Sequence, residues 1–400
     1  MITVDVALER VLAGLAPTAT EVVALPAALG RVLAEDACAR LAHPPSDVSA
    51  MDGYAVRAED IAGPGSRLTV IGESGAGHPF AGTIGPGQTV RIFTGAPMAK
   101  GADSVVMQED TARDGDTVTI TVPQAAGRHV RPQGADFSVG DCLLKAGTLL
   151  GPRQIGLAAA MNLPWLTVRR RPRIAILSTG DEIVMPGDPV GTAQIVSSNG
   201  PALAAIIAQA GGEPVQLGIA KDSRDSLSAM IKAAAGCDLL VTSGGASVGD
   251  YDLVQDVLAE QGLELDFWKI AIRPGKPLMY GKLKHVPVLG LPGNPVSAMV
   301  CAYVFLLPML RALQGLTPVV PPVAARLGGP VKANDGRQDY QRARLERRPD
   351  GSLVATPFPR QDSAVVSGLA AAGCLLIRPP HAPEGKEGDP VLVMPLPDGG

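Results

Sequence analysis

Acidic side chains follow three of the short hydrophobic segments between residues 173 and 300. Glu182 comes after RIAIL, Asp222 comes after PVQLGIA, and Asp252 lies beyond DLLV. Mg²⁺ prefers a few carboxylates together with phosphate oxygens from a ligand. A single acid at the start of a helix is often only a cap, and Asp222 fits that role equally well. Three acids that each follow a short hydrophobic segment nevertheless indicate a metal site, so Glu182, Asp222 and Asp252 are the predicted ligands.

Glycine-rich turns follow the same segments and offer backbone N–H groups to an anion. They are STGDE at 178–182, SGGASVG at 243–249 and LPGNP at 291–295. Glycines let the N–H groups of a loop turn toward an oxyanion, and the dipole of the following helix adds to the attraction. An ordinary tight turn is the alternative for each loop. The predicted anion-binding residues are Ser178, Thr179, Gly180, Ser243, Gly244, Gly245, Ser247, Pro292, Gly293 and Asn294.

Residues 245–249 also match the G-x-S-x-G pattern of hydrolase nucleophiles. In those enzymes the serine stands at the tip of a sharp turn from strand to helix. Here Ser247 lies six residues after Val241, in a looser loop, so the spacing disfavours a hydrolase. The sequence has no Walker A motif, and its histidines have no ligand spacing, which disfavours an ATPase and a histidine metal site.

Three cations lie within or just after the segment DFWKIAI: Lys269, Arg273 and Lys276. Two prolines in RPGKP (273–277) stiffen the turn and hold its cations in place, as a phosphate or oxyanion site requires. A solvated charged turn is the alternative. Nearer the N-terminus, SAMDGYAV (49–56) contains Asp52 and RIFTGAP (91–97) contains Thr94, each beside a predicted turn.

The elements that must position these residues alternate between strands and helices. Helices are predicted at 201–210, 223–235, 252–261 and 295–313. Alternating strands and helices predict an open, largely parallel sheet, which binds ligands at the carboxyl ends of its strands. We therefore expect the acids, cations and glycine turns to meet at one edge of that sheet.

The rest of the chain predicts a multidomain α/β plus β protein. The expected parts are a helical linking domain (1–40 and 137–171), a β domain (41–136), the doubly wound α/β domain (172–317), and a small barrel-like C-terminal β domain (318–400). The first helix of the linking domain is expected to pack against either that domain or the α/β domain. Prolines at 318, 321 and 322 mark the last boundary.

Composition excludes several classes of protein. The net charge of −4 and the absence of a long basic run disfavour nucleic-acid binding. The apolar run 296–310 is shorter than the roughly 20 residues of a membrane span, so a buried helix is expected there. The five scattered cysteines, without a C-x-x-C pair, disfavour a disulfide framework and predict a reducing cytoplasm.

Taken together, these segments resemble the molybdopterin molybdenumtransferase family, which includes the bacterial MoeA proteins and the gephyrin E domain. The resemblance runs nearly end to end, through SAMDGYAVR (49–57), RIFTGAP, GAD (134–136), STGDE, SGGASVG, RPGKP and LPGNPVSA (291–298). It implies a cytoplasmic homodimer that inserts molybdate into the dithiolene of adenylated molybdopterin, releases AMP and uses Mg²⁺. It also implies transient contact with the adenylyltransferase of the pathway and with apo-molybdoenzymes.

The resemblance extends the predicted site beyond the α/β domain. It implies a cleft between the α/β domain of one subunit and the β domain of the other. Asp52, Thr94 and Asp136 belong to the β-domain side; Arg342, within YQRA, and Ser363, within QDS, belong to the tail. It assigns catalysis to Asp52, Thr94, Glu182, Asp222 and Asp252, and substrate binding to Asp136, Arg342, Ser363, the three cations and the anion-binding turns.

Two positions depart from the family, and three alternative functions remain. Ser197 stands where many members have an acid, and Arg273 stands where some have lysine. STGDE, SGG and LPGNP also fit a molybdopterin adenylyltransferase, but SAMDGYAV, RIFTGAP and the β tail disfavour it. A non-catalytic scaffold like gephyrin is a second alternative, although nothing in this sequence resembles the long linker and additional fused domain expected of such a scaffold. A paralogue that handles tungstate in place of molybdate is a third alternative.

Overall fold

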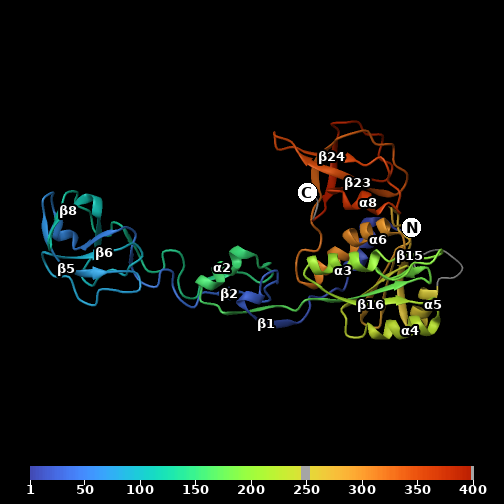
Figure 1. Cartoon of the computed structure of the whole chain (residues 1–400), viewed down its shortest axis with the longest axis horizontal. Coiled ribbons are helices and arrows are strands. Elements are labelled where there is room, and N and C mark those ends of the chain that lie inside the picture. The colour runs from blue at the N-terminus through green and yellow to red at the C-terminus, as the bar shows by residue number, and fades with distance from the viewer. Residues whose placement is uncertain (245–252, 398–400) are drawn as a thin grey trace. The chain divides into compact units, whose positions relative to one another are not determined.

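The computed structural model describes residues 1–244 and 253–397, which form two compact units (Figure 1). One unit contains residues 1–21 and 169–400, and the other contains residues 22–168. The first unit carries the α/β sheet and the C-terminal barrel, and the second carries the β domain and the linking segments. Each unit is described by itself.

A six-stranded sheet forms the centre of the first unit, in the order β16-β13-β17-β21-β20-β18. Strand β13 pairs in parallel with β16 and β17, and β17 pairs in parallel with β21. Strand β20 runs antiparallel to both β21 and β18. The predicted doubly wound, mostly parallel sheet is therefore confirmed. Its strands are β13 (Arg173–Thr179), β16 (Glu213–Ala220), β17 (Leu239–Ser243), β18 (Leu263–Trp268), β20 (Met279–Leu283) and β21 (Val286–Leu291).

Helices cover both faces of this sheet, as Figure 1 shows for α3 and α6 on one side and α4 and α5 on the other. They are α3 (Asn199–Gln209), α4 (Arg224–Ala233), α5 (Leu253–Glu260) and a continuous run of α6 (Pro295–Cys301), the π-helical turn η4 (Ala302–Leu306) and α7 (Leu307–Leu313). The first helix, α1 (Val4–Leu12), packs Val4, Ala7 and Val11 into the core on the α7 side.

The run Pro295–Leu313 is long and apolar enough to cross a membrane by length and composition. However, 72% of its most apolar window is buried inside the protein. Val296, Phe305 and Leu310 lie in the same core as the sheet residues Ile176 and Leu289. This burial agrees with the predicted core helix.

The tail of the chain closes into a five-stranded barrel, in agreement with the predicted barrel-like domain. Strands β23, β24, β22, β26 and β25 follow one another, and β25 pairs again with β23. Short β19 adds to β23 in parallel and joins the barrel to the α/β domain. The elements are β19 (Ile272–Arg273), β22 (Val323–Leu327), β23 (Gln338–Arg347), β24 (Leu353–Pro357), α8 (Val366–Ala370), β25 (Cys374–Arg378) and β26 (Pro390–Pro395).

The second unit contains a six-stranded mixed sheet in the order β7-β4-β6-β5-β9-β8. Its two hydrophobic clusters include Tyr54, Leu68 and Val118 in one, and Ala55, Val90 and Ile92 in the other. This sheet is the predicted N-terminal β domain. Its strands are β4 (Gly53–Val56), β5 (Arg67–Ser74), β6 (Gln88–Ile92), β7 (Ser104–Met107), β8 (Thr111–Asp114) and β9 (Thr117–Ile120).

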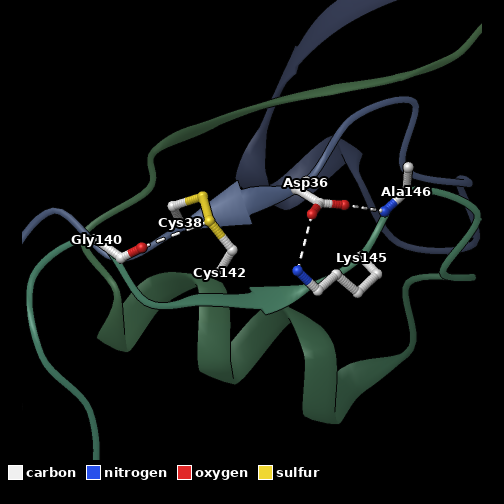
Figure 2. Close-up of a disulfide and its surroundings, with 6 residues drawn as sticks. All are labelled: Asp36, Cys38, Gly140, Cys142, Lys145 and Ala146. Atoms are coloured by element: carbon white, nitrogen blue, oxygen red, sulfur yellow. Dashed lines mark hydrogen bonds and ion pairs between the residues drawn. A yellow bond between two sulfur atoms is a disulfide. The ribbon is translucent and has the colours of Figure 1, made fainter.

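The linking segments of the second unit contain a disulfide, which corrects the sequence prediction. Strands β2 (Ala37–Cys38) and β11 (Cys142–Leu144) pair antiparallel beside α2 (Pro152–Ala160), and Cys38 is bonded to Cys142 (Figure 2). The two cysteines are 104 residues apart, so no local spacing pattern could reveal the pair. Cys237, Cys301 and Cys374 are free and buried.

Other expectations need correction in detail. Residues 1–40 are expected to be helical, but residues 20–27 instead form β1 (Thr20–Ala24), which pairs with β12 (Trp165–Arg169), and the short η1 (Leu25–Ala27). Val22 and Val23 favour a strand there because β-branched side chains pack well on a pleated surface. The remaining short elements are β3 (Val48–Ser49), β10 (Val130–Arg131), β14 (Ile183–Val184), β15 (Ile195–Val196), η2 (Ala58–Ile61) and η3 (Gln108–Asp110). The division into four domains stays a prediction.

Candidate functional site

Five glycine-rich or polar turns lie at one edge of the α/β sheet. Strands β13, β16, β17 and β21 all run in the same direction, so the turns that follow them share the carboxyl edge. Strand β18 also ends there, because β20 is antiparallel to both of its neighbours. The structure therefore brings the segments 178–182, 221–222, 243–244, 269–277 and 291–294 to one edge.

Gly244 allows two of these turns to touch through their backbones. It adopts φ 93°, and a Cβ at this position would lie 2.7 Å from the carbonyl oxygen of Thr179. Its N–H donates to the carbonyl of Leu291 at 3.3 Å. Only glycine fits so close an approach in this conformation. Gly244 thus connects the turns after β13, β17 and β21.

Asn199 joins the same turns through its side chain and is absent from the sequence prediction. Its amide Nδ2 donates to the Ser243 hydroxyl and to the Gly293 carbonyl, each at 2.8 Å. Asn199 is the first residue of α3, where an asparagine is ordinarily taken for a helix cap. The partners are 44 and 94 residues away, so only the fold reveals this role.

The other predicted residues of these turns differ in accessibility. Ser178, Thr179 and Ser243 are buried, whereas Gly293 and Asn294 are exposed. Gly180 adopts φ 136°, and Pro292 follows the last residue of β21. Ser197, the departure noted above, is buried, and its N–H donates to the Val184 carbonyl at 2.8 Å.

The acids at this edge are exposed, and one of them was missed. The side chain of Glu182 folds back over Gly180. The backbone N–H of Asp222 donates to the carboxylate of Asp181 at 3.1 Å, so Asp181 is the acid that links the turns after β13 and β16. In residues 1–244 and 253–397, no three His, Cys, Asp or Glu side chains cluster as a metal site would require. Gly245, Ser247 and Asp252 lie outside the described residues, so the predicted metal site stays a prediction.

The three predicted cations have different surroundings. The ammonium of Lys269 lies 4.0 Å from the centre of the Trp268 ring, and Lys276 is exposed. Lys269 has φ 72°, outside the range of a strand, and β18 ends just before it at Trp268.

Arg273 is already paired with acids of the C-terminal barrel. Its guanidinium donates to Asp339 at 2.7 Å and Asp335 at 3.3 Å, and also to the Asn334 side chain at 2.8 Å. The hydrogen bond to Asp339 is the main cause of the raised pKa of Arg273. This side chain fastens β19 to the barrel, and its phosphate-binding role stays a prediction.

Arg342 is buried and supports a loop at the site, and its substrate-binding role stays a prediction. It is 1% exposed, and its guanidinium donates to the carbonyls of Val365, Asp362 and Arg360 at 2.9, 3.0 and 3.2 Å. Burial lowers its pKa. A sequence motif cannot show that an arginine points inward, because the side chain has the same charge in either orientation.

The loop that Arg342 holds brings Ser363 to the LPGNP turn. The hydroxyl of Ser363 accepts a hydrogen bond from Asn294 Nδ2 at 3.1 Å. The carbonyl of Ser363 accepts one from the N–H of Val296, also at 3.1 Å. The structure therefore places Ser363 beside the LPGNP turn, and its substrate-binding role stays a prediction.

The β domain brings together the two residues predicted from SAMDGYAV and RIFTGAP. Asp52 precedes β4 and Thr94 follows β6, and the pairing of Gly53 with Ile92 places them side by side. One carboxylate oxygen of Asp52 accepts the N–H of Thr94 at 2.7 Å and its hydroxyl at 2.8 Å. These hydrogen bonds lower the pKa of Asp52, so it is ionised at neutral pH.

Arg91 lies beside this pair and was not predicted. Its guanidinium is 5.2 Å from the Tyr54 ring and 5.0 Å from the Phe93 ring. It donates to the Gly53 carbonyl at 3.2 Å and to Gln108 Oε1 at 2.6 Å. Asp136 is exposed on a separate segment, where its N–H donates to the His43 carbonyl at 2.9 Å.

Family models match three parts of the chain. The MoeA N-terminal region (domains I and II) matches residues 2–162, a probable molybdopterin binding domain matches residues 175–312, and the MoeA C-terminal region (domain IV) matches residues 324–396.

Relatives and solved structures agree with these matches. A molybdopterin molybdenumtransferase of Nostoc is 43% identical over 77% of this chain and 72% of its own length. One from Haemophilus influenzae is 35% identical over 99% of both chains. A crystal structure of a molybdopterin biosynthesis MoeA protein from Pyrococcus horikoshii has a TM-score of 0.86 at 35% identity and covers 99% of both chains. The chain therefore belongs to the molybdopterin molybdenumtransferase family.

Proposed function

We propose that this protein inserts molybdenum from molybdate into the dithiolene of adenylated molybdopterin and releases AMP. The observation that carries the proposal is the 35% identity, over 99% of both chains, with a relative named molybdopterin molybdenumtransferase. The site agrees with this chemistry, because the substrates are a dianion and a molecule with a diphosphate.

The turns at the carboxyl edge would bind these anions. N–H groups of the glycine turns, with Lys269 and Lys276, would offset the charge of molybdate and the diphosphate. The two dithiolene sulfurs bind molybdenum directly, so no side-chain nucleophile is needed. One molybdate oxygen leaves with both thiol protons as water, and molybdenum keeps its oxidation state. A second water splits the diphosphate bond and frees AMP.

Magnesium dependence is part of the proposal. Glu182 and Asp222, with Asp252, present the hard oxygen donors that suit Mg²⁺, and the first two follow neighbouring strands. Bound there, Mg²⁺ would polarise the phosphate that is cleaved. We expect Glu182→Gln and Asp252→Asn to lower AMP release; full release by both variants would contradict the assignment.

Several wider features of the proposal depend on the family. We propose a homodimer in which Asp52, Thr94 and Asp136 of one subunit face the α/β domain of the other. The protein would act in the cytoplasm and contact the adenylyltransferase and apo-molybdoenzymes transiently. The disulfide between Cys38 and Cys142 removes the argument from cysteine spacing, so family membership alone supports the cytoplasmic location.

The experiment is to incubate the full-length protein with Mg²⁺ and adenylated molybdopterin, with and without molybdate, and measure AMP. We expect AMP to accumulate above the protein-free blank only when molybdate is present. AMP at the blank level in both arms would overturn the proposal and favour a scaffold. Adenylated product from molybdopterin and ATP would favour the adenylyltransferase. A third arm with tungstate determines which oxyanion is preferred.

A further inference from the structure

A mostly apolar pocket lies directly beside the anion-binding turns. It has a volume of about 230 Å³ and lies where α3, the α6–η4 run and α8 meet near the end of β26. Its walls include Ala202, Met299, Tyr303, Leu369 and Leu396, and Asn199 stands at its edge. Pockets that enclose a whole drug-sized ligand measure roughly 300–1,000 Å³. The pocket therefore suits one ring system better than the complete substrate.

The pocket and the anion-binding turns share residues. Asn199 lines the pocket, and its amide also bonds Ser243 and Gly293. Pro295 lines it too and directly follows Asn294 in the LPGNP turn. A phosphate on the turns would therefore be next to a group in the pocket, as the parts of one ligand are.

The wall formed by Tyr303 comes from an irregular turn. Tyr303 lies in the π-helical turn Ala302–Leu306, which interrupts an otherwise α-helical run. Such turns are rare and occur frequently at functional sites. The turn contributes an aromatic ring, and Met299 in α6 contributes a thioether, both of which pack well against flat rings.

The chemistry of the pocket points to an uncharged ring. Among its described lining residues there is no carboxylate, ammonium or guanidinium, whereas Ser198 and Asn199 offer polar atoms. A flat ring with nitrogen atoms can bury its faces against the apolar walls and form hydrogen bonds along its rim.

We propose that this pocket holds one planar nitrogen heterocycle of the adenylated substrate while the neighbouring turns hold its phosphate. The proposal rests on the proposed function. The substrate has two such rings, adenine and the pterin, on opposite sides of the diphosphate, and both fit this chemistry.

The test uses calorimetric titration of the full-length protein with three probes: inorganic pyrophosphate, AMP and 6-hydroxymethylpterin phosphate. Ala202→Trp fills the pocket from α3 and leaves the turns unchanged. Ala205→Trp, on the exposed side of the same helix, is the matched control. We expect Ala202→Trp to weaken one ring-bearing probe about tenfold or more, to leave pyrophosphate affinity unchanged, and the control to alter neither. The probe that is weakened identifies the ring.

Equal affinity of the wild type and Ala202→Trp for both ring-bearing probes would overturn the pocket assignment. So would pyrophosphate binding to the wild type without binding of either ring-bearing probe. Failure of all three probes to bind the wild type would instead count against the anion site of the proposed function. Ala370→Trp, which enters the pocket from α8, repeats the test if thermal unfolding shows that Ala202→Trp is not folded.

Discussion

The carboxyl edge of the α/β sheet and the Asp52 corner of the β domain are held together differently. At the sheet edge, Asn199, Gly244 and the loop of Ser363 join turns that are far apart in the sequence. At the corner, one carboxylate binds the backbone and side chain of Thr94. The edge therefore depends on the whole fold of its unit, whereas the corner is a local feature of two paired strands.

The linking segments next to the β domain are also held together by a covalent bond. The bond between Cys38 and Cys142 joins the strand before residues 43–137 to the strand after them. Asp36 and Lys145 form an ion pair at 2.9 Å next to it (Figure 2). That pair is exposed, so its contribution to stability is small.

The largest expected effect is the loss of this disulfide. Replacing both cysteines by serine should lower the free energy of unfolding of residues 22–168 by about 2–5 kcal/mol, because the unfolded chain gains freedom over a long loop. Thermal unfolding with and without dithiothreitol measures the effect. The double serine variant should not respond to the reductant. Titration of five free thiols before reduction, instead of three, would contradict the bond.

Arg342→Ala should have the next largest effect. The substitution leaves the carbonyls of Arg360, Asp362 and Val365 without their buried donor and should destabilise the barrel by about 2–3 kcal/mol. Hydrogen exchange of residues 360–365 should rise. Arg344→Ala, at an exposed position on the same strand, is the control. Unchanged exchange in Arg342→Ala would mean that the arginine does not hold the loop.

Gly244→Ala tests the close contact of the turns. The new Cβ would collide with Thr179, and the backbone conformation would be strained, at a cost of about 1–3 kcal/mol. AMP release should fall by about 10- to 100-fold, because small displacements at a binding site reduce rates strongly. Gly63→Ala, with open space around the new methyl group, should leave both properties unchanged. Equal activity of the two variants would contradict the predicted role of the contact.

The smallest expected effect concerns the pKa of Asp52. Because its pKa is lowered in the folded protein, the stabilising contribution of the carboxylate is present above its unfolded pKa and lost as the pH falls through the folded value. Thr94→Val removes the hydroxyl but keeps the backbone N–H, which is the larger cause, so the pKa should rise only part of the way to its ordinary value. NMR titration of the Asp52 carboxyl carbon measures this pKa in both proteins. An Asp52 pKa that is the same in Thr94→Val and the wild type would contradict the inference that the Thr94 hydroxyl stabilises the carboxylate.

The fold of the α/β domain follows closely from the sequence because hydrophobic strands and helices alternate regularly there. The helices predicted at 201–210, 223–235 and 295–313 match α3, α4 and the α6–η4–α7 run within a few residues. Strand β20 was missed because its five residues directly follow the proline-rich turn and contain Gly281. Strands β4 and β8, with four residues each, and β22, with five, were missed as well.

The site was predicted less completely, because several of its roles depend on contacts between distant residues. Asn199 and Arg91 resemble an ordinary cap and an ordinary strand residue until their partners are known. Sequence motifs placed Glu182 at the edge but could not show that Asp181 receives the Asp222 N–H. For the same reason, the sequence did not show that the guanidinium groups of Arg342 and Arg273 form hydrogen bonds within the barrel.

The central claim is that the turns after β13, β17 and β21 form one site for an oxyanion. The most direct test is a crystal of the full-length protein soaked in molybdate and measured at the molybdenum absorption edge. We expect an anomalous peak within hydrogen-bonding distance of residues 178–180, 243–244 or 291–294. Peaks found only elsewhere on the protein, with these turns empty, would contradict the account.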